Sequence, residues 1–241
     1  NDYNDFTIDG DISTSGSGAK GIYLEDGITN TYNTFIITGD ITTSGTEGNS
    51  EGILVEGGQS FNTFTLSGKV ESTGGNKAIY VKSTANGFGR PIYPQSNTFN
   101  LNAGTNVIGG FYNEGRSTTI TNQGAIDTLT NSGTITTLNN LESGLTYSGT
   151  LPVNYNIIIN SSTAYGSTSF SNATGTTTFG LDTVNSTSGL GGYFSDILSG
   201  IGTESLTATS GNSGSQYWVI LDPDSGNDSL DLNLSYVGDQ T

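Results

Sequence analysis

Residues 33–44 read Asn-Thr-Phe-Ile-Ile-Thr-Gly-Asp-Ile-Thr-Thr-Ser, and this stretch decides the fold. Close copies stand at residues 4–15 and 62–73, and a fourth copy begins at residue 97 and then degrades. The phenylalanine of each copy recurs every 29 residues, as Phe6, Phe35 and Phe64. A self-similar period of this length is typical of a solenoid, in which each repeat is one turn of the chain.

Within each copy apolar residues alternate with polar ones, which indicates a strand with one buried face. A second strand-like patch keeps its place between copies, at residues 21–24, 52–55 and 78–81. One turn cannot bury its inner face alone, so we expect turns to stack with phenylalanine over phenylalanine, about 4.8 Å apart. The asparagine that heads each copy should form a hydrogen-bonded ladder along the same axis, and the four are Asn4, Asn33, Asn62 and Asn97.

From residue 120 the period shortens to nine, in the series Ile120, Leu129, Leu138 and the series Asn122, Asn131, Asn140. Two such nonads would make one narrow turn of chain. A left-handed hexapeptide helix would need a strict six-residue period, which the sequence lacks. The sequence therefore predicts an all-β fold, a right-handed parallel β-helix (solenoid) with a C-terminal β-rich cap. We expect the coils to fill residues 1–145, and residues 146–241 to continue the solenoid into the cap.

The C-terminal third of the sequence does not follow the repeats of the first part. Candidate strands there are residues 156–159, 168–170, 176–181, 216–222 and 229–237. Residues 192–201 (G-Y-F-S-D-I-L-S-G-I) suggest one short amphipathic helical turn. Trp218 lies in a strand-like run and is expected in the core. A solenoid exposes its end coils to unwanted pairing, so a cap of altered sequence is expected at one end.

Composition excludes several function classes. Charged residues are only 12% of the chain and aromatic residues 10%, which favours strands and turns over disorder. The absence of Cys and His excludes disulfides, Cys–His zinc sites and any histidine general base. A net charge of -16 with six Lys and Arg residues argues against nucleic-acid binding. No apolar run approaches the roughly 20 residues that a membrane-spanning helix needs.

The Asn-Thr-Phe-x-Ile-x-Gly coils and the Thr-Asn-x-Gly-x-Ile nonads resemble those of bacterial autotransporter (type V secretion) passengers. Residues 156–237 are similar to the autochaperone segment that precedes the translocator barrel in that family. The resemblance implies export through the outer membrane and an extracellular, cell-surface location. It also implies that any membrane contact is made through a barrel that these residues do not include.

An insertion at residues 85–95 stretches one period from 29 to 35. It carries Phe88, Arg90 and Tyr93, and aromatic and arginine side chains are the usual anchors of an interface. Long loops on solenoids often carry function. We expect these three residues to contact a partner, namely a surface glycan, a protein or another copy of the chain. The alternative is a loop that packs as a cover over a neighbouring coil.

Three groups of acidic residues are candidates for a chemical site. Asp222, Asp224, Asn227 and Asp228 have the oxygen density of a calcium loop, although the closing glutamate is absent, and the alternative is a plain hairpin loop. Asp11, Asp40 and Lys69 occupy equivalent positions and are expected to form an outward ladder rather than a catalytic pair. Glu25, Asp26 and Glu56 are expected to be solvated turn residues.

The sequence therefore predicts a structural or adhesive β-solenoid of the cell surface, such as a stalk, matrix or adhesin element. We expect neither catalysis nor a cofactor, calcium excepted. Two alternatives stay open: a self-assembling extracellular fibre subunit, and a carbohydrate-active enzyme built on a β-helix.

Overall fold

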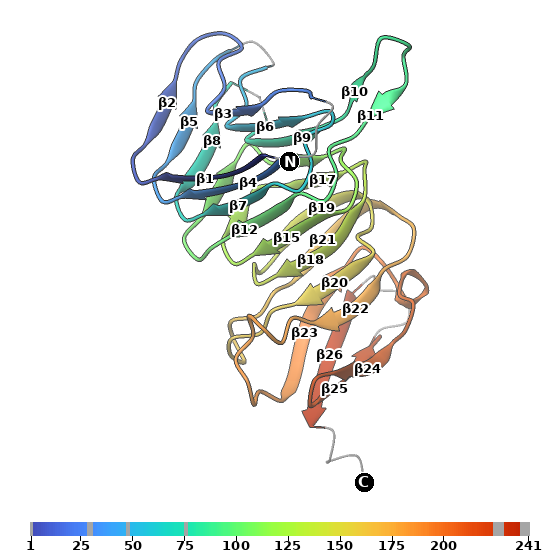
Figure 1. Cartoon of the computed structure of the whole chain (residues 1–241). Coiled ribbons are helices and arrows are strands. Elements are labelled where there is room, and N and C mark those ends of the chain that lie inside the picture. Colours follow the sequence, from blue (N-terminus) through green and yellow to red (C-terminus); the bar gives the residue numbers. More distant parts are fainter. Residues whose placement is uncertain (1, 28–30, 47–48, 75–76, 224–228, 237–241) are drawn as a thin grey trace. The chain divides into compact units, whose positions relative to one another are not determined.

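The alternating pattern forms short strands that pair with their equivalents one repeat away. The computed structural model describes residues 2–27, 31–46, 49–74, 77–223 and 229–236. This part of the chain is all-β, with one short 3-10 helix at Thr203–Ser205 (Figure 1). It divides into two units, Asn1–Thr136 and Thr137–Thr241.

In the first unit the chain visits three parallel sheets in turn. The first sheet contains β1 (Asp2–Ile8), β4 (Thr31–Ile37), β7 (Thr63–Leu66), β12 (Thr98–Leu101) and β15 (Thr118–Asn122). The second contains β2 (Ile12–Thr14), β5 (Ile41–Thr43), β8 (Lys69–Ser72), β13 (Asn106–Ile108) and β16 (Ala125–Ile126). The third contains β3 (Ile22–Leu24), β6 (Ile53–Glu56), β9 (Ile79–Lys82), β14 (Phe111–Asn113) and β17 (Leu129–Asn131). We call three successive strands, one from each sheet, a rung, so that β1, β2 and β3 form the first rung.

The predicted phenylalanine stack is confirmed. Phe6 pairs with Phe35 and Phe35 with Phe64, and their ring centroids lie 4.9 and 4.8 Å apart. Phe99 extends the stack, with its ring centroid 4.9 Å from that of Phe64. The exposed fraction falls from 45% at Phe6 to 6% at Phe35 and 0% at Phe64. The dry interior therefore begins at the second rung, because no described strand covers the open side of the first.

The predicted asparagine ladder is also confirmed. Each side-chain amide donates to the carbonyl oxygen of the next, over 2.9 Å from Asn4 to Asn33, 2.9 Å from Asn33 to Asn62 and 3.0 Å from Asn62 to Asn97. The Asn97 amide then donates to the backbone oxygen of Gln59. Asn33, Asn62 and Asn97 are buried, so the ladder supplies the hydrogen bonds that buried amides require.

The length of a turn changes along the first unit. Paired residues are 29 apart between the asparagines of the first two rungs and 35 apart between Asn62 and Asn97. The longer turn contains a hairpin formed by β10 (Thr84–Ala85) and β11 (Pro91–Ile92). At Asn113 and Asn131, on the third sheet, the offset has fallen to 18 residues.

The second unit begins with parallel strands and ends with antiparallel ones. β18 (Ile135–Asn140) contributes its residues from Thr137 onward and pairs in parallel with β20 (Asn154–Ile157), which pairs with β22 (Thr178–Leu181). β19 (Leu145–Thr150), β21 (Thr168–Thr174) and β23 (Gly192–Ser199) form a second parallel set. β23 then pairs antiparallel with β26 (Ser229–Tyr236), β26 with β25 (Gln216–Leu221), and β25 with β24 (Ser210–Ser213). Trp218 is buried at 4% exposure, as predicted.

The helical turn expected at residues 192–201 is wrong, because this segment is strand β23. Asp196 adopts a positive φ of 51°, and the pairing with β26 shifts register between Phe194 and Leu198. This irregularity places Phe194, Ile197 and Leu198 on the buried side at spacings of three and four residues. A bulged strand therefore imitates the apolar spacing of a helix.

Candidate functional site: a projecting hairpin and the face beside it

The hairpin of β10 and β11 projects from the first unit, drawn in green-blue in Figure 1. Its tip is held by Asn86, whose Oδ1 accepts the backbone N–H groups of Phe88 and Arg90, both at 3.0 Å. The Asn86 N–H donates to the Arg90 oxygen, and Gly89 closes the turn with a φ of +73°. Asparagine and glycine are suited to such a turn, because one bonds to its own backbone and the other tolerates positive φ.

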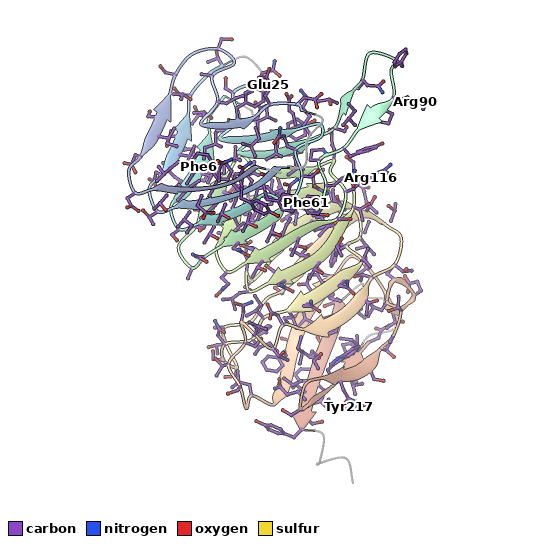
Figure 2. All side chains as sticks on the ribbon, in the orientation of Figure 1. Phe6, Glu25, Phe61, Arg90, Arg116 and Tyr217 are labelled. Atoms are coloured by element: carbon purple, nitrogen blue, oxygen red, sulfur yellow. The ribbon has the colours of Figure 1, made fainter. Side chains whose placement is uncertain are left out.

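The tip presents an apolar ring and a cation to solvent. Phe88 is 92% exposed, so for this residue the alternative of a packed cover is excluded. Arg90 is also exposed, and the described residues place no carboxylate within 4.0 Å of its guanidinium. Figure 2 shows Arg90 out on the projecting hairpin. An ordered turn with an exposed Phe and an unengaged Arg has the composition of a contact site.

Tyr93 lies at the base of the hairpin and not at its tip. Its ring is half-buried under Arg116, whose guanidinium carbon lies 4.0 Å from the ring centroid. The Arg116 N–H also donates to the Pro94 oxygen at 2.8 Å. The structure therefore brings Phe88 and Arg90 together at the tip and places Tyr93 in a supporting cation–π contact.

Carboxylates anchor the first strand of the hairpin. Glu114 Oε2 accepts from both the N–H and the hydroxyl of Ser83, at 3.0 and 2.8 Å. Asp26 Oδ2 accepts from the Thr84 hydroxyl at 2.8 Å. Charge-assisted bonds of this kind fix the direction in which the hairpin leaves the sheet.

A face of tyrosines and carboxylates lies beside the hairpin, over β3, β6, β9 and β14. Tyr23 donates to Glu56 at 2.6 Å and Lys82 donates to the same carboxylate at 2.6 Å. Partial burial acts to raise the pKa of Glu56, but the bonds from Lys82 and Tyr23 outweigh it and hold the pKa below the usual range. The hydrogen bond to Glu56 raises the pKa of Tyr23. Glu56 is thus an engaged anion, and the expectation of a solvated turn residue was wrong for it.

Lysine also covers the aromatic rings of this face. The Lys77 ammonium lies 3.3 Å from the ring centroid of Tyr80 and 4.8 Å from that of Tyr112. Burial lowers the pKa of Lys77. Tyr80 donates to Glu114, and burial followed by this bond raises the pKa of Tyr80. Positive charge is concentrated in this unit, since the six basic residues of the sequence are Lys20, Lys69, Lys77, Lys82, Arg90 and Arg116.

A second stack of aromatic rings was not predicted from the sequence. Tyr3, Tyr32 and Phe61 stack with centroids 4.9 and 4.7 Å apart. Tyr3 is 71% exposed and Phe61 39% exposed, and Phe61 is labelled in Figure 2. Each ring directly precedes a ladder asparagine, so the 29-residue period contained the signal.

The predicted outward ladder forms at Asp11, Asp40 and Lys69, but Lys69 joins it through its backbone N–H and not through its ammonium group. Asp11 Oδ1 accepts the Asp40 N–H at 2.8 Å, and Asp40 Oδ1 accepts the Lys69 N–H at 2.7 Å. The Lys69 ammonium turns to Glu71 instead, at 2.5 Å. These carboxylates therefore cap the backbone of the next rung.

The proposed calcium residues fall mainly outside the described part of the chain. Asp222 is exposed just after β25, whereas Asp224, Asn227 and Asp228 lie outside the described residues. Within the described ranges no group of three or more His, Cys, Asp or Glu residues is placed to hold a metal ion. A hollow of about 210 Å³ in the second unit is lined by Ser, Thr and Gly residues and Gln216.

Comparison with known proteins gives no relative. No family model, no curated protein and no solved structure matches this chain. Among the described residues no helix is long and apolar enough to cross a membrane.

Proposed function

We propose that the chain is an extracellular structural and adhesive element built as a right-handed parallel β-helix. Three observations support the β-helix: the rotation of the chain through three parallel sheets, the phenylalanine stack and the asparagine ladder. The antiparallel strands β23 to β26 act as the β-rich cap. Stacked rungs with buried ladders make a stiff support, which suits the stalk or adhesin of a bacterial cell surface.

The hairpin supplies the adhesive contact. Phe88, 92% exposed on a tip pinned by Asn86, is the observation that carries this proposal. A rigid tip loses little conformational entropy on binding, so its exposed ring and cation are effective anchors. On a chain of net charge -16, Arg90 offers a local attraction for the carboxylates or sulfates of a surface glycan or protein.

An attachment assay tests this role. Beads coated with the whole chain are applied to an array of surface polysaccharides and extracellular-matrix proteins, and retention is counted under flow. We expect Phe88→Ala and Arg90→Ala each to lower retention at least tenfold, while Phe61→Ala, at a less exposed phenylalanine outside the hairpin, leaves it unchanged. Equal retention by all variants, or no retention by the parent chain, rejects the adhesive role.

A fibre subunit is the second candidate, and the constant register between β1, β4 and β7 favours it, because rungs of equal spacing can stack from one copy onto another. Electron micrographs of the chain over a range of concentrations separate the two roles. Filaments that lengthen with concentration would indicate a fibre subunit, whereas single particles would indicate a stalk.

A further inference from the structure

The tip of the projecting hairpin contains Asn86–Gly87, the one Asn-Gly pair in the sequence. In such a pair the backbone nitrogen of the glycine can attack the side-chain carbonyl carbon of the asparagine, because glycine has no side chain to obstruct the approach. The attack closes a cyclic imide and releases the side-chain nitrogen as ammonia. Whether a folded chain permits the reaction depends on which of the reacting atoms are already engaged in hydrogen bonds.

Both nitrogen atoms of the reaction are unengaged at this turn. The Gly87 N–H, which carries the attacking nitrogen, donates to no described residue, and Gly87 is exposed. The Asn86 side chain bonds through Oδ1, so its Nδ2, the nitrogen that leaves, has no partner within the described chain. Among the described residues, therefore, no hydrogen bond has to break before either nitrogen reacts.

The side-chain carbonyl oxygen, in contrast, is held by two donors. Asn86 Oδ1 accepts the backbone N–H groups of Phe88 and Arg90, both at 3.0 Å. This oxygen gains negative charge when the Gly87 nitrogen attacks, and preorganised N–H groups that face a developing oxyanion lower the barrier to acyl transfer. The two bonds that pin the tip therefore also favour attack on the amide carbon.

We propose that Asn86 is a site of self-catalysed deamidation within the folded hairpin. A bond forms between the Gly87 nitrogen and Asn86 Cγ, the bond from Cγ to Nδ2 breaks, and ammonia leaves with the proton that Gly87 gives up. Water, the sole co-reactant, then opens the imide at either of its carbonyl groups. Both aspartate and isoaspartate are thus formed at residue 86.

Each product alters the contact site at the tip, and this consequence, unlike the reaction itself, rests on the proposed adhesive function. Aspartate keeps the acceptor oxygens but adds negative charge to the tip that carries Arg90, which weakens the attraction of Arg90 for an anionic partner. Isoaspartate inserts one more carbon into the main chain, which displaces the acceptor from the N–H groups of Phe88 and Arg90. The hairpin thus limits the lifetime of its own attachment.

Peptide mapping by mass spectrometry tests the reaction without a binding assay. The whole chain is incubated in mildly alkaline buffer, and aspartate and isoaspartate at residue 86 are measured over time. One comparator is the exposed Asn212 of the same chain, which precedes Ser213. The other is a synthetic peptide of residues 82–95, in which no sheet holds the turn. We expect Asn86 to convert at least about tenfold faster than Asn212, and at least as fast as it does in the peptide.

Gly87→Ala is the matched variant. Gly87 lies outside the positive-φ region, and a Cβ added to it meets nothing within 4 Å, so the melting temperature should not change. The methyl group obstructs the approach of the backbone nitrogen to Asn86 Cγ, so we expect conversion at residue 86 to slow at least about tenfold. Incubation should lower retention of the parent chain on the surface array but not that of Gly87→Ala.

Three results would overturn the proposal: slower conversion in the folded chain than in the peptide, equal conversion in Gly87→Ala, or aspartate without isoaspartate, which would indicate direct hydrolysis. The adhesive consequence fails separately. If residue 86 converts as expected and Asn86→Asp is retained as well as the fresh parent chain, the reaction stands and its effect on attachment is refuted. A parent chain that is never retained rejects the adhesive function and leaves the mass-spectrometric result in force.

Discussion

Replacing Phe64 by alanine tests whether the stacked rings hold the first unit together. Phe64 is 0% exposed and lies between Phe35 at 4.8 Å and Phe99 at 4.9 Å. A buried Phe→Ala change typically costs 3–5 kcal/mol, so we expect Phe64→Ala to lower the free energy of unfolding by about 4 kcal/mol. Phe6→Ala is the matched control. Phe6 is 45% exposed and has one ring neighbour in its file, so its loss should cost roughly 1–2 kcal/mol.

Urea denaturation followed by circular dichroism measures both variants. Trp218 lies in the second unit and is 4% exposed, so its fluorescence reports that unit separately. We expect the Phe64→Ala change to shift the circular dichroism transition and to lower hydrogen-exchange protection in β4, β7 and β12. Equal losses for Phe64→Ala and Phe6→Ala would refute the argument that the interior is sealed from the second rung inward.

Three further predictions concern the asparagine ladder, the close approach of Gly39 to the neighbouring rung, and the buried phenol of Tyr155. Asn62→Ala should cost about 2–3 kcal/mol in urea denaturation because it leaves its ladder neighbours unpaired, whereas the same change at the exposed Asn4 should cost under about 1 kcal/mol. Gly39→Ala should lower the melting temperature clearly and Gly10→Ala should not, because only the first places a methyl group against backbone; equal melting would contradict the close approach of the rungs. Burial raises the pKa of Tyr155 to about 12, while the unfolded chain loses this proton near pH 10, so the stability it contributes is complete below about pH 10 and is lost up to about pH 12. Over that window the unfolding free energy of the parent chain should fall more steeply than that of Tyr155→Phe, by about 1.4 kcal/mol per pH unit, and parallel pH profiles would exclude the shift.

Sequence alone predicted the parts of the fold that repetition specifies. Equal spacing in a stacked chain places like residues over like, so the positions of Phe35, Asn33 and β6 followed from the period. Residues 192–201 were misassigned because a bulge at Asp196 alters the alternation that marks a strand. Such a bulge depends on pairing with β26, which lies far along the sequence.

The candidate site was predictable in composition but not in geometry. The insertion was recognised because it lengthened one repeat, and its Phe88 and Arg90 share the tip. Whether an inserted loop folds back or projects depends on local hydrogen bonds such as those of Asn86, which residue types do not specify. The anchoring role of Glu114 was missed for a similar reason, since its partner Ser83 belongs to a different turn.

The constant offset between the first three rungs has an evolutionary consequence. Because β1, β4 and β7 make equivalent contacts at one spacing, duplication of residues 33–61 would yield a longer molecule whose new phenylalanine fits between existing rings. Each duplication would add one strand spacing, roughly 4.8 Å, without any new side-chain packing to be invented. The length of the stack of rungs can therefore change during evolution in small, uniform steps.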